Sequence, residues 1–347
     1  MKLQITILYT EIADYSIACF RALKRQNIDL ILIHWPINPE APFQFDLTFC
    51  DQVISRNEMS DESLISTVKD FNPDLILCSG WLDRVYLNIC TRRSNRIPVV
   101  LSMDNHWTGS IKQRIATLIA PFKILNAFNR AFVPGEAQRQ YALKLGFEEA
   151  SIKTGFYSSD TGKFQSVFEN TGDQKKLDFP KRFLYLGRYV EHKGIFDLWD
   201  AFQKFRLTDP EWELWCVGTG DQFENRVKAE GIKHFGFIQP VDMLPILKET
   251  GVYILPSHFE PWGVSVHEMA VAGFPMLLSD KIGSKEAFLD GNGHEFESGN
   301  VDSLLEAMQW TAKLEVTELN RMAERSNELG LKNTPEIWAS TLLSFLK

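Results

Sequence analysis

The stretch that decides the fold is Val252-Tyr253-Ile254-Leu255-Pro256-Ser257-His258-Phe259-Glu260-Pro261-Trp262-Gly263-Val264-Ser265-Val266-His267-Glu268. Its first residues form an apolar run without polar alternation, which is typical of a strand that helices cover on both faces in a parallel sheet. Pro261 and Gly263 predict a tight turn, and a helix is expected to begin near Gly263. A strand, a turn and a helix in this order predict an α/β domain whose ligands bind where the strand ends.

The same alternation of short apolar runs and helical patterns continues along the chain in both directions. Strands are expected at residues 5–9, 29–34, 74–79, 99–103, 131–134, 182–187, 212–217, 252–256 and 275–279. Helices are expected between them, for example at residues 17–25, 61–70 and 195–205, and from Asp221 to Ala229. The sequence therefore predicts two doubly wound domains with parallel sheets, and a ligand site in a cleft between them.

The alternation weakens at residues 157–180, which are polar and rich in turn residues. We therefore predict a first domain at residues 1–165, an interdomain linker at 166–180 and a second domain at 181–330. Pro335 is expected to begin a last helix within residues 331–347, and this helix is expected to pack back on the first domain.

Composition excludes several classes of protein. The chain has 347 residues, of which 44% are hydrophobic and 24% charged, as in an ordinary soluble globular protein and unlike a disordered or collagen-like chain. The formal net charge of −8 argues against a general nucleic-acid binder. Five cysteines without a C-x-x-C motif predict reduced thiols rather than a zinc site or a disulfide framework. With no signal-like start and no apolar run of ~18 residues, we expect a cytoplasmic protein without a membrane span.

Positive charge is concentrated in residues 84–130, where Asp104 is the only acidic residue. The basic residues there are Arg84, Arg92, Arg93, Arg96, Lys112, Arg114, Lys123 and Arg130. Within and after this region, residues 111–133 mix large apolar side chains with these cations. They are interpreted either as a pair of core helices or as a surface that lies on an anionic membrane and reaches a lipid-linked acceptor.

Two cations follow the strand at 182–187, in the segment Gly187-Arg188-Tyr189-Val190-Glu191-His192-Lys193-Gly194. Arg188 and Lys193 at a strand-to-helix turn favour binding of a multiply charged anion such as a diphosphate. A solvated loop that ends in a glycine cap is the alternative.

Glu260 and Glu268 flank the turn after residue 256. Eight helical residues would separate them by ~12 Å of rise, whereas the two carboxylates of a glycosidase act across a single bond at about 5–9.5 Å. Separate tasks are therefore favoured, with each carboxylate accepting hydrogen bonds from sugar hydroxyls.

These motifs resemble the family 4 glycosyltransferases. The resemblance lies in the G-R-x4-K-G pattern of residues 187–194, the E-P-x-G-x4-E pattern of 260–268 and Ala270-Val271-Ala272-Gly273-Phe274-Pro275, and it is specific over about residues 181–312. It implies a retaining hexosyltransferase of the GT-B fold, with two Rossmann-like domains facing across a cleft. Tyr15 and the segment Phe20-Arg21 resemble a bacterial surface-polysaccharide subgroup.

The resemblance implies a role for each matching residue. Arg188 and Lys193, beside Gly187, would bind the donor diphosphate in place of a metal, so no metal or other cofactor is expected. Glu268 would hold the ribose, and Glu260 the transferred sugar. The remaining donor contacts would come from the amides of Gly263 and Val264, from backbone at Phe237 and Ile238 that meets the base, and from Gly283 and Ser284.

The first half matches the family less well, because residues 10–15 lack the glycine-rich turn of the family. Asp104 and His106 follow the strand at 99–103 and are candidate catalytic residues, and His106 resembles the family's histidine near the reacting sugar. A turn histidine with local hydrogen bonds is the alternative. Trp81, Trp107 and Trp262 are candidates to stack on sugar rings, and the first two would bind the acceptor.

Together these features predict transfer of a sugar from a nucleotide donor to a hydroxyl of a glycan or lipid-linked acceptor, with retention of configuration, in surface polysaccharide, O-antigen or capsule synthesis. Two other functions are compatible with the same motifs. A nucleotide-sugar epimerase would convert the donor without any acceptor, and a non-catalytic subunit would bind the nucleotide sugar and leave it intact.

Overall fold

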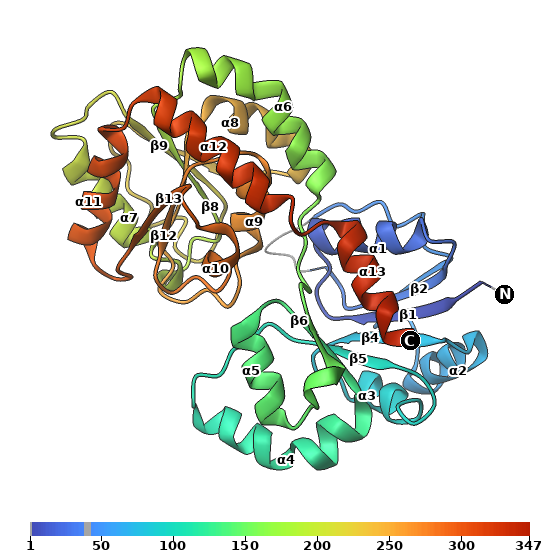
Figure 1. The fold of residues 1–347 in the computed structure, drawn as a ribbon. Helices are drawn as coiled ribbons and strands as arrows, with labels where there is room; N and C mark the ends of the chain where they lie inside the picture. Colours follow the sequence, from blue (N-terminus) through green and yellow to red (C-terminus); the bar gives the residue numbers. More distant parts are fainter. Residues whose placement is uncertain (1, 38–42) are drawn as a thin grey trace. The chain divides into compact units, whose positions relative to one another are not determined.

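A computed structural model describes residues 2–37 and 43–347 of the chain. The chain divides into two compact units, and each of them is a parallel sheet covered by helices (Figure 1). Unit 1 comprises Met1–Ser159 and Asn333–Lys347, and unit 2 comprises Asp160–Lys332. Every strand pairing with an assigned register is parallel, which confirms the sheet type predicted from the unalternated apolar runs.

Unit 1 contains a seven-stranded sheet in the order β3-β2-β1-β4-β5-β6-β7. Its strands are β1 (Gln4–Tyr9), β2 (Asp29–His34), β3 (Gln52–Ser55), β4 (Leu75–Ser79), β5 (Val99–Ser102), β6 (Arg130–Val133) and β7 (Ile152–Thr154). Its helices are α1 (Asp14–Lys24), α2 (Asp61–Phe71), α3 (Arg84–Thr91), α4 (Ile111–Ala127), α5 (Glu136–Leu145) and α13 (Pro335–Leu343).

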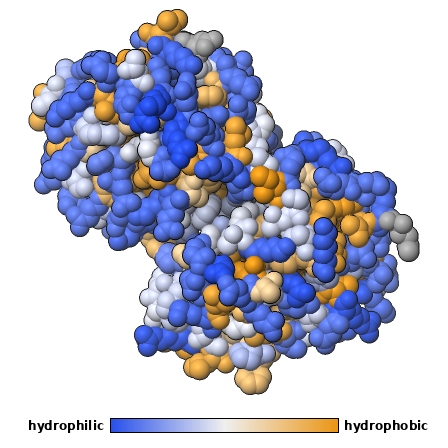
Figure 2. Space-filling model, in the orientation of Figure 1, coloured by the Kyte–Doolittle hydropathy of each residue, from blue (hydrophilic) through white to orange (hydrophobic). Residues whose placement is uncertain are grey.

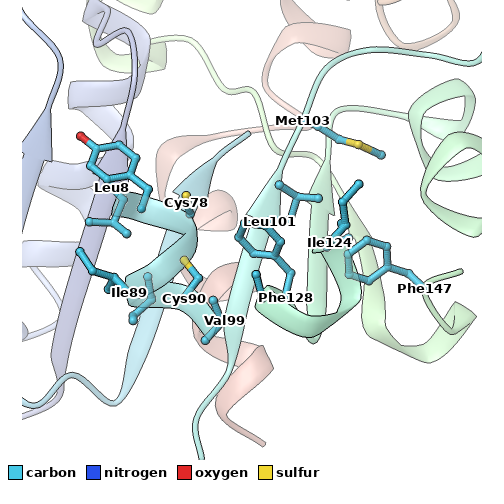
Figure 3. Packing of buried hydrophobic residues seen from close by; sticks show 14 of the residues in the cluster. Leu8, Cys78, Ile89, Cys90, Val99, Leu101, Met103, Ile124, Phe128 and Phe147 are labelled. Atoms are coloured by element: carbon cyan, nitrogen blue, oxygen red, sulfur yellow. The ribbon is translucent and has the colours of Figure 1, made fainter. Parts of the chain in front are cut away.

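Successive residues of the central strands point to opposite faces of this sheet and fill two cores. On one face, Val99 and Leu101 of β5 pack with Cys90 of α3 and with Ile124 of α4 (Figure 3). On the other face, Val100 packs in the core that α1 and α13 cover. Trp338 of α13 is buried there against Phe20, Phe132 and Phe156, so the last helix belongs to the hydrophobic core of unit 1.

Unit 2 contains a six-stranded sheet in the order β10-β9-β8-β11-β12-β13. Its strands are β8 (Arg182–Leu186), β9 (Glu213–Val217), β10 (Ile232–Gly236), β11 (Val252–Leu255), β12 (Met276–Ser279) and β13 (Gly293–Phe296). Its helices are α6 (Thr161–Leu177), α7 (Ile195–Phe205), α8 (Leu244–Glu249), α9 (Val264–Val271), α10 (Lys285–Phe288), α11 (Val301–Ala312) and α12 (Val316–Gly330).

Two local predictions are wrong. The linker expected at residues 166–180 is largely helix, because α6 spans Thr161–Leu177 within unit 2. Phe164, Val167, Thr171 and Lys175 recur at helical spacing and are buried, so a narrow buried stripe outweighs the turn-forming composition. The helix expected from Asp221 to Ala229 does not form, and the chain there makes successive turns held partly by the Gln222 amide, which donates to the Tyr189 carbonyl.

Lys175 of α6 is a charged group in an apolar environment. Its side chain is 6% exposed, its ammonium lies 4.0 Å from the centre of the Phe274 ring, and it has no hydrogen-bond partner among the described residues. Burial lowers the pKa of Lys175 to about 7, because the ammonium loses water that no carboxylate replaces.

We expect Lys175→Met to raise the melting temperature at pH 7. A lysine whose pKa is lower in the folded than in the unfolded state costs stability fully below the folded pKa, and the cost fades as pH rises towards 10.5. The gain from methionine should therefore be largest at or below pH 7 and shrink by up to about 1.4 kcal/mol per pH unit above it. Thermal unfolding of both proteins at pH 6 to 10 measures this, with exposed Lys313→Met as control; a gain independent of pH would contradict a buried charge.

Candidate functional site

The sheet of unit 2 changes winding direction between β8 and β11. These strands are neighbours in the sheet, yet β9 and β10 separate them in sequence and lie on the other side of β8. In open α/β sheets, ligands bind at this point, where the connections after two adjacent strands diverge. The connection after β8 carries residues 187–194, and the connection after β11 carries residues 256–263. The topology therefore brings the two predicted motifs to one edge of the sheet.

Close backbone approach explains the glycine that ends the first motif. Gly194 has a φ of +68°, and a Cβ atom on it would lie 2.1 Å from the Pro256 carbonyl oxygen. A glycine is needed here both for the left-handed conformation and for the space. As a result the segment after β8 lies directly against the end of β11.

Side chains and backbone join the two connections. The His258 amide donates to the His192 carbonyl at 2.8 Å. Lys193 Nζ and a carboxylate oxygen of Glu260 form an ion pair, and both side chains are largely buried. The structure thus brings together a predicted phosphate-binding cation and a predicted sugar-binding carboxylate that lie 67 residues apart in sequence.

The predicted helix after the turn is present and begins at Val264. Gly263 precedes it with a φ of +88°. The loop after β12 packs against the same turn, since the Gly283 amide donates to the Glu260 carbonyl at 2.9 Å and the Ser284 amide to the Trp262 carbonyl at 3.0 Å. Gly283 and Ser284 therefore lie beside Glu260 and Gly263, as expected of residues that share one site.

Glu260 and Glu268 both influence the pKa of Tyr253, a buried residue of β11. Burial raises the pKa of Tyr253, and the negative charges of Glu260 and Glu268 raise it further. The Tyr253 hydroxyl donates to Ser265 Oγ at 2.8 Å, one turn before Glu268 on α9. The two carboxylates thus border the same region, one before the helix and one within it.

Lys193 and Arg188 add positive charge to the same region. The pKa of His192 is lowered by burial and then by the charge of Lys193, with a smaller contribution from Arg188. The Arg188 side chain is exposed, while its carbonyl accepts a 2.7 Å hydrogen bond from the Tyr185 hydroxyl. Gly187 is fixed by its amide, which donates to the Val217 carbonyl at 3.1 Å.

A hydrogen-bonded chain orders the neighbouring end of β10. The Tyr189 hydroxyl donates to His234 Nδ1 at 2.9 Å, and His234 Nε2 donates to the Val227 carbonyl at 2.9 Å. Burial lowers the pKa of His234, which keeps the ring neutral in this arrangement. Half-buried Phe237 and Ile238 follow this strand, and their contact with a nucleotide base stays a prediction.

One polar pair at the site lies outside the sequence predictions. His258 Nε2 lies 2.6 Å from Asp197 Oδ2, so the loop after β11 is also tied to the first turn of α7. The sequence shows His258 within the decisive stretch but gives no sign of its partner 61 residues away.

In unit 1 the candidate residues follow strands of the central sheet. The Asp104 carboxylate accepts a 3.2 Å hydrogen bond from the Tyr157 hydroxyl, and the His106 carbonyl accepts one of 2.7 Å from Gln113 Nε2. Trp81 and Trp107 are half-buried and pack on the core, with Trp107 against Tyr141. Their roles towards an acceptor stay predictions.

Trp262 is not available to stack on a sugar. Its side chain is 6% exposed and packs edge-on against Phe288 at 6.3 Å between ring centres. The turn after Pro261 directs this indole into the core of unit 2, a direction that composition alone does not reveal.

Among residues 2–37 and 43–347, no group of three or more His, Cys, Asp or Glu side chains is placed to hold a metal ion. No helix in that part of the chain is both long and apolar enough to span a bilayer.

Part of the chain is similar in sequence to known glycosyltransferases. Residues 168–329 match the family model described as glycosyl transferases group 1. A glycogen synthase of Mycobacterium tuberculosis is 31% identical over 119 residues, which are 32% of this chain and 29% of that protein. The lipopolysaccharide 1,6-galactosyltransferase of Salmonella typhimurium is 22% identical over 260 residues, 69% of this chain and 65% of that one. The chain thus spans less than a third of the length of the glycogen synthase it matches.

Solved structures share the architecture over the whole chain. A glycosyltransferase from Rickettsia africae has a TM-score of 0.76 at 14% identity and covers 100% of this chain and 99% of its own. The Anabaena protein HepE, solved in complex with UDP and glucose, has a TM-score of 0.72 at 14% identity, with 97% and 98% covered. At such identities the likeness shows the fold alone, and it confirms the predicted GT-B fold.

Proposed function

We propose that this protein is a retaining glycosyltransferase that moves a hexose from a nucleoside diphosphate to a hydroxyl of a glycan or lipid-linked acceptor, in bacterial surface-polysaccharide assembly. The observation that carries the proposal is the junction of Lys193 and Glu260 at the winding change of the unit 2 sheet. The match of residues 168–329 to a glycosyltransferase family model supports it. So does the UDP found in HepE, a protein of the same fold.

In the proposed reaction, the bond between the sugar C1 and the β-phosphate oxygen breaks, and its electron pair leaves with the nucleoside diphosphate. The acceptor oxygen forms the new bond to C1 on the same face, and its proton passes to the departing phosphate oxygen. Negative charge therefore grows on the diphosphate, where Arg188, Lys193 and the amides of Gly263 and Val264 would stabilise it.

The carboxylates have a different task in this scheme. Glu268 would accept hydrogen bonds from the ribose hydroxyls, and Glu260 from hydroxyls of the transferred sugar. Without donor, Lys193 neutralises the largely buried Glu260. With donor bound, sugar hydroxyls would satisfy Glu260 and the Lys193 ammonium would turn to the phosphate, so the ion pair holds both groups ready without leaving a buried charge unpaired.

A panel of nucleotide sugars tests the assignment. A donor present at a hundred times its Kd should stabilise the protein by about 2.7 kcal/mol, because it binds only the folded state. Glu268→Ala should weaken binding of that donor at least tenfold, since a carboxylate that accepts two hydroxyls contributes more than about 1.4 kcal/mol. Thermal shift and calorimetry measure both, with exposed Glu306→Ala as the matched control. Equal affinity in Glu268→Ala and the control would contradict the ribose role.

Product analysis separates the two rival functions. Incubation of the wild-type protein with its donor alone should leave the sugar configuration unchanged, whereas an epimerase would convert it. Addition of an acceptor should release nucleoside diphosphate in step with glycosidic product. A binding subunit would release none, and that result would overturn the proposal.

A further inference from the structure

Helix α4 has two apolar faces. One is buried on unit 1 through Ala120, Ile124 and Ala127. The opposite face exposes five large apolar side chains, which we call the α4 stripe: Ile111 (77% exposed), Ile115 (52%), Leu118 (75%), Ile119 (43%) and Phe122 (83%). Figure 2 shows apolar side chains along the edge of unit 1 where Figure 1 places α4. One side of α4 therefore belongs to the core, as the first interpretation expects, while the other side is an exposed apolar surface, which the second interpretation requires.

The α4 stripe has the geometry of a helix that lies along an interface. At ~100° per residue, its five members fall within about 100° of arc, centred opposite the buried residues. Lys112, Arg114 and Lys123 flank the arc on both sides, and α4 contains no acidic residue. An apolar stripe bordered by cations is the pattern of helices that insert into the headgroup boundary of a bilayer.

The lysines and arginines of residues 84–130 have no acidic partner among the described residues. No ion pair in that part of the chain joins a carboxylate to any of these lysines or arginines. Arg114 donates to the Gly109 carbonyl, and Arg93 to Asn72 and to the Lys69 carbonyl. By contrast Arg139, just beyond this region, pairs with Glu136 and Glu149. The positive charges of Lys112, Arg114 and Lys123 beside the α4 stripe complement an anionic surface with an apolar interior.

We propose that the α4 stripe and its flanking cations dock unit 1 on an anionic lipid bilayer, with α4 parallel to the membrane plane. Phe122, Leu118 and Ile111 would enter the acyl boundary, and Lys112, Arg114 and Lys123 would contact lipid phosphates. The docking surface is separate from the donor site in unit 2 and does not depend on its chemistry. We assign this docking the role of giving access to a lipid-linked acceptor, and that role rests on the function proposed above.

Cosedimentation with vesicles tests the docking directly. The 347-residue chain should bind vesicles of phosphatidylcholine with 30% phosphatidylglycerol at low salt. It should bind pure phosphatidylcholine at least tenfold more weakly and lose most binding at 0.5 M NaCl. Phe122→Glu should lower the partition coefficient at least tenfold, and Lys112→Glu/Lys123→Glu by a similar factor. All three positions are exposed, so the melting temperature of either variant should not change.

Matched controls lie in unit 2. Leu207 is 85% exposed, and Lys313 and Lys332 are also exposed. Leu207→Glu therefore replaces an exposed apolar side chain, and Lys313→Glu/Lys332→Glu two exposed lysines, away from α4, and both variants should bind as wild type does. Equal loss in these controls, or no binding of the wild type to anionic vesicles at low salt, overturns the proposal. Analytical sedimentation without lipid tests whether a second copy of the chain covers the α4 stripe instead. A concentration-dependent dimer that Phe122→Glu abolishes would show this, and it would also overturn the proposal of membrane docking.

The vesicle assay contains no nucleotide sugar, so its outcome is distinguishable from failure of the proposed function. Phe122→Glu should keep the wild-type donor affinity in the thermal-shift panel. Loss of vesicle binding with intact donor binding is the expected combination.

Discussion

Turnover of the purified Lys193→Ala protein is expected to fall at least a hundredfold. Lys193 is held at the winding change of the unit 2 sheet by its ion pair with Glu260 and by the close packing of its loop on Pro256. Removal of one preorganised charge that stabilises a developing anion costs about 2.7–4 kcal/mol in the transition state. Initial rates of nucleoside diphosphate release, at saturating donor and acceptor, measure the effect.

Two comparisons make this result specific. Lys204→Ala removes an exposed lysine that pairs with Asp200 on α7, and it should retain the wild-type rate. Lys193→Ala also leaves Glu260 without its ion-pair partner, so Lys193→Ala/Glu260→Gln removes the unpaired charge. The double variant should recover stability but not turnover. A near-normal rate in the folded Lys193→Ala protein would contradict the proposed role of Lys193 in stabilising the diphosphate.

The second large effect is expected from Gly194→Ala, in stability and turnover together. A left-handed conformation costs a non-glycine residue about 1–2 kcal/mol, and forcing a methyl group into filled space costs about 1–3 kcal/mol more. The new Cβ would meet the Pro256 carbonyl, so the segment after β8 must move away from β11 and Lys193 away from Glu260. At about 2–4 °C per kcal/mol, we expect the melting temperature to fall by about 5–15 °C.

A substitution at a glycine in open space distinguishes the conformational cost from the steric cost. Gly299 has a φ of +73°, and a Cβ on it would meet no atom within 4 Å, so Gly299→Ala carries the conformational cost alone. Thermal unfolding and kcat/KM of both variants measure the difference. If Gly194→Ala were no worse than Gly299→Ala in either quantity, the close approach of the two loops would not matter to the site.

Sequence patterns predicted the central strands and the places of the two motifs after β8 and β11, because both depend on local signals. Val252–Leu255 is an unbroken apolar run, and the cations and acids follow their strands directly. The edge strands β3, β7 and β13 lie outside the predictions, since they are only three or four residues long and partly exposed, as in Gln52–Ser55. The few buried residues of helix α6 lie among many polar ones, so the composition of this segment does not predict a helix.

Contacts between residues far apart in the sequence could not be predicted either. The His258–Asp197 pair and the approach of Gly194 to Pro256 depend on which strands become neighbours, and periodicity along one segment does not encode that. The burial of Trp262 has the same origin, because the turn that carries it packs against α10. Residue types thus indicate what chemistry is available, and strand order decides which groups meet.

The contribution of α13 to unit 1 sets the order in which the chain can mature on the ribosome. Unit 2 is one continuous segment, whereas the core around Phe20 and Phe132 remains open until Trp338 has been synthesised. At about 5–20 residues per second, the nascent first unit waits on the order of ten seconds or more with an apolar surface uncovered. During that interval it is a natural client for chaperones, and the second unit can reach its native state before the first.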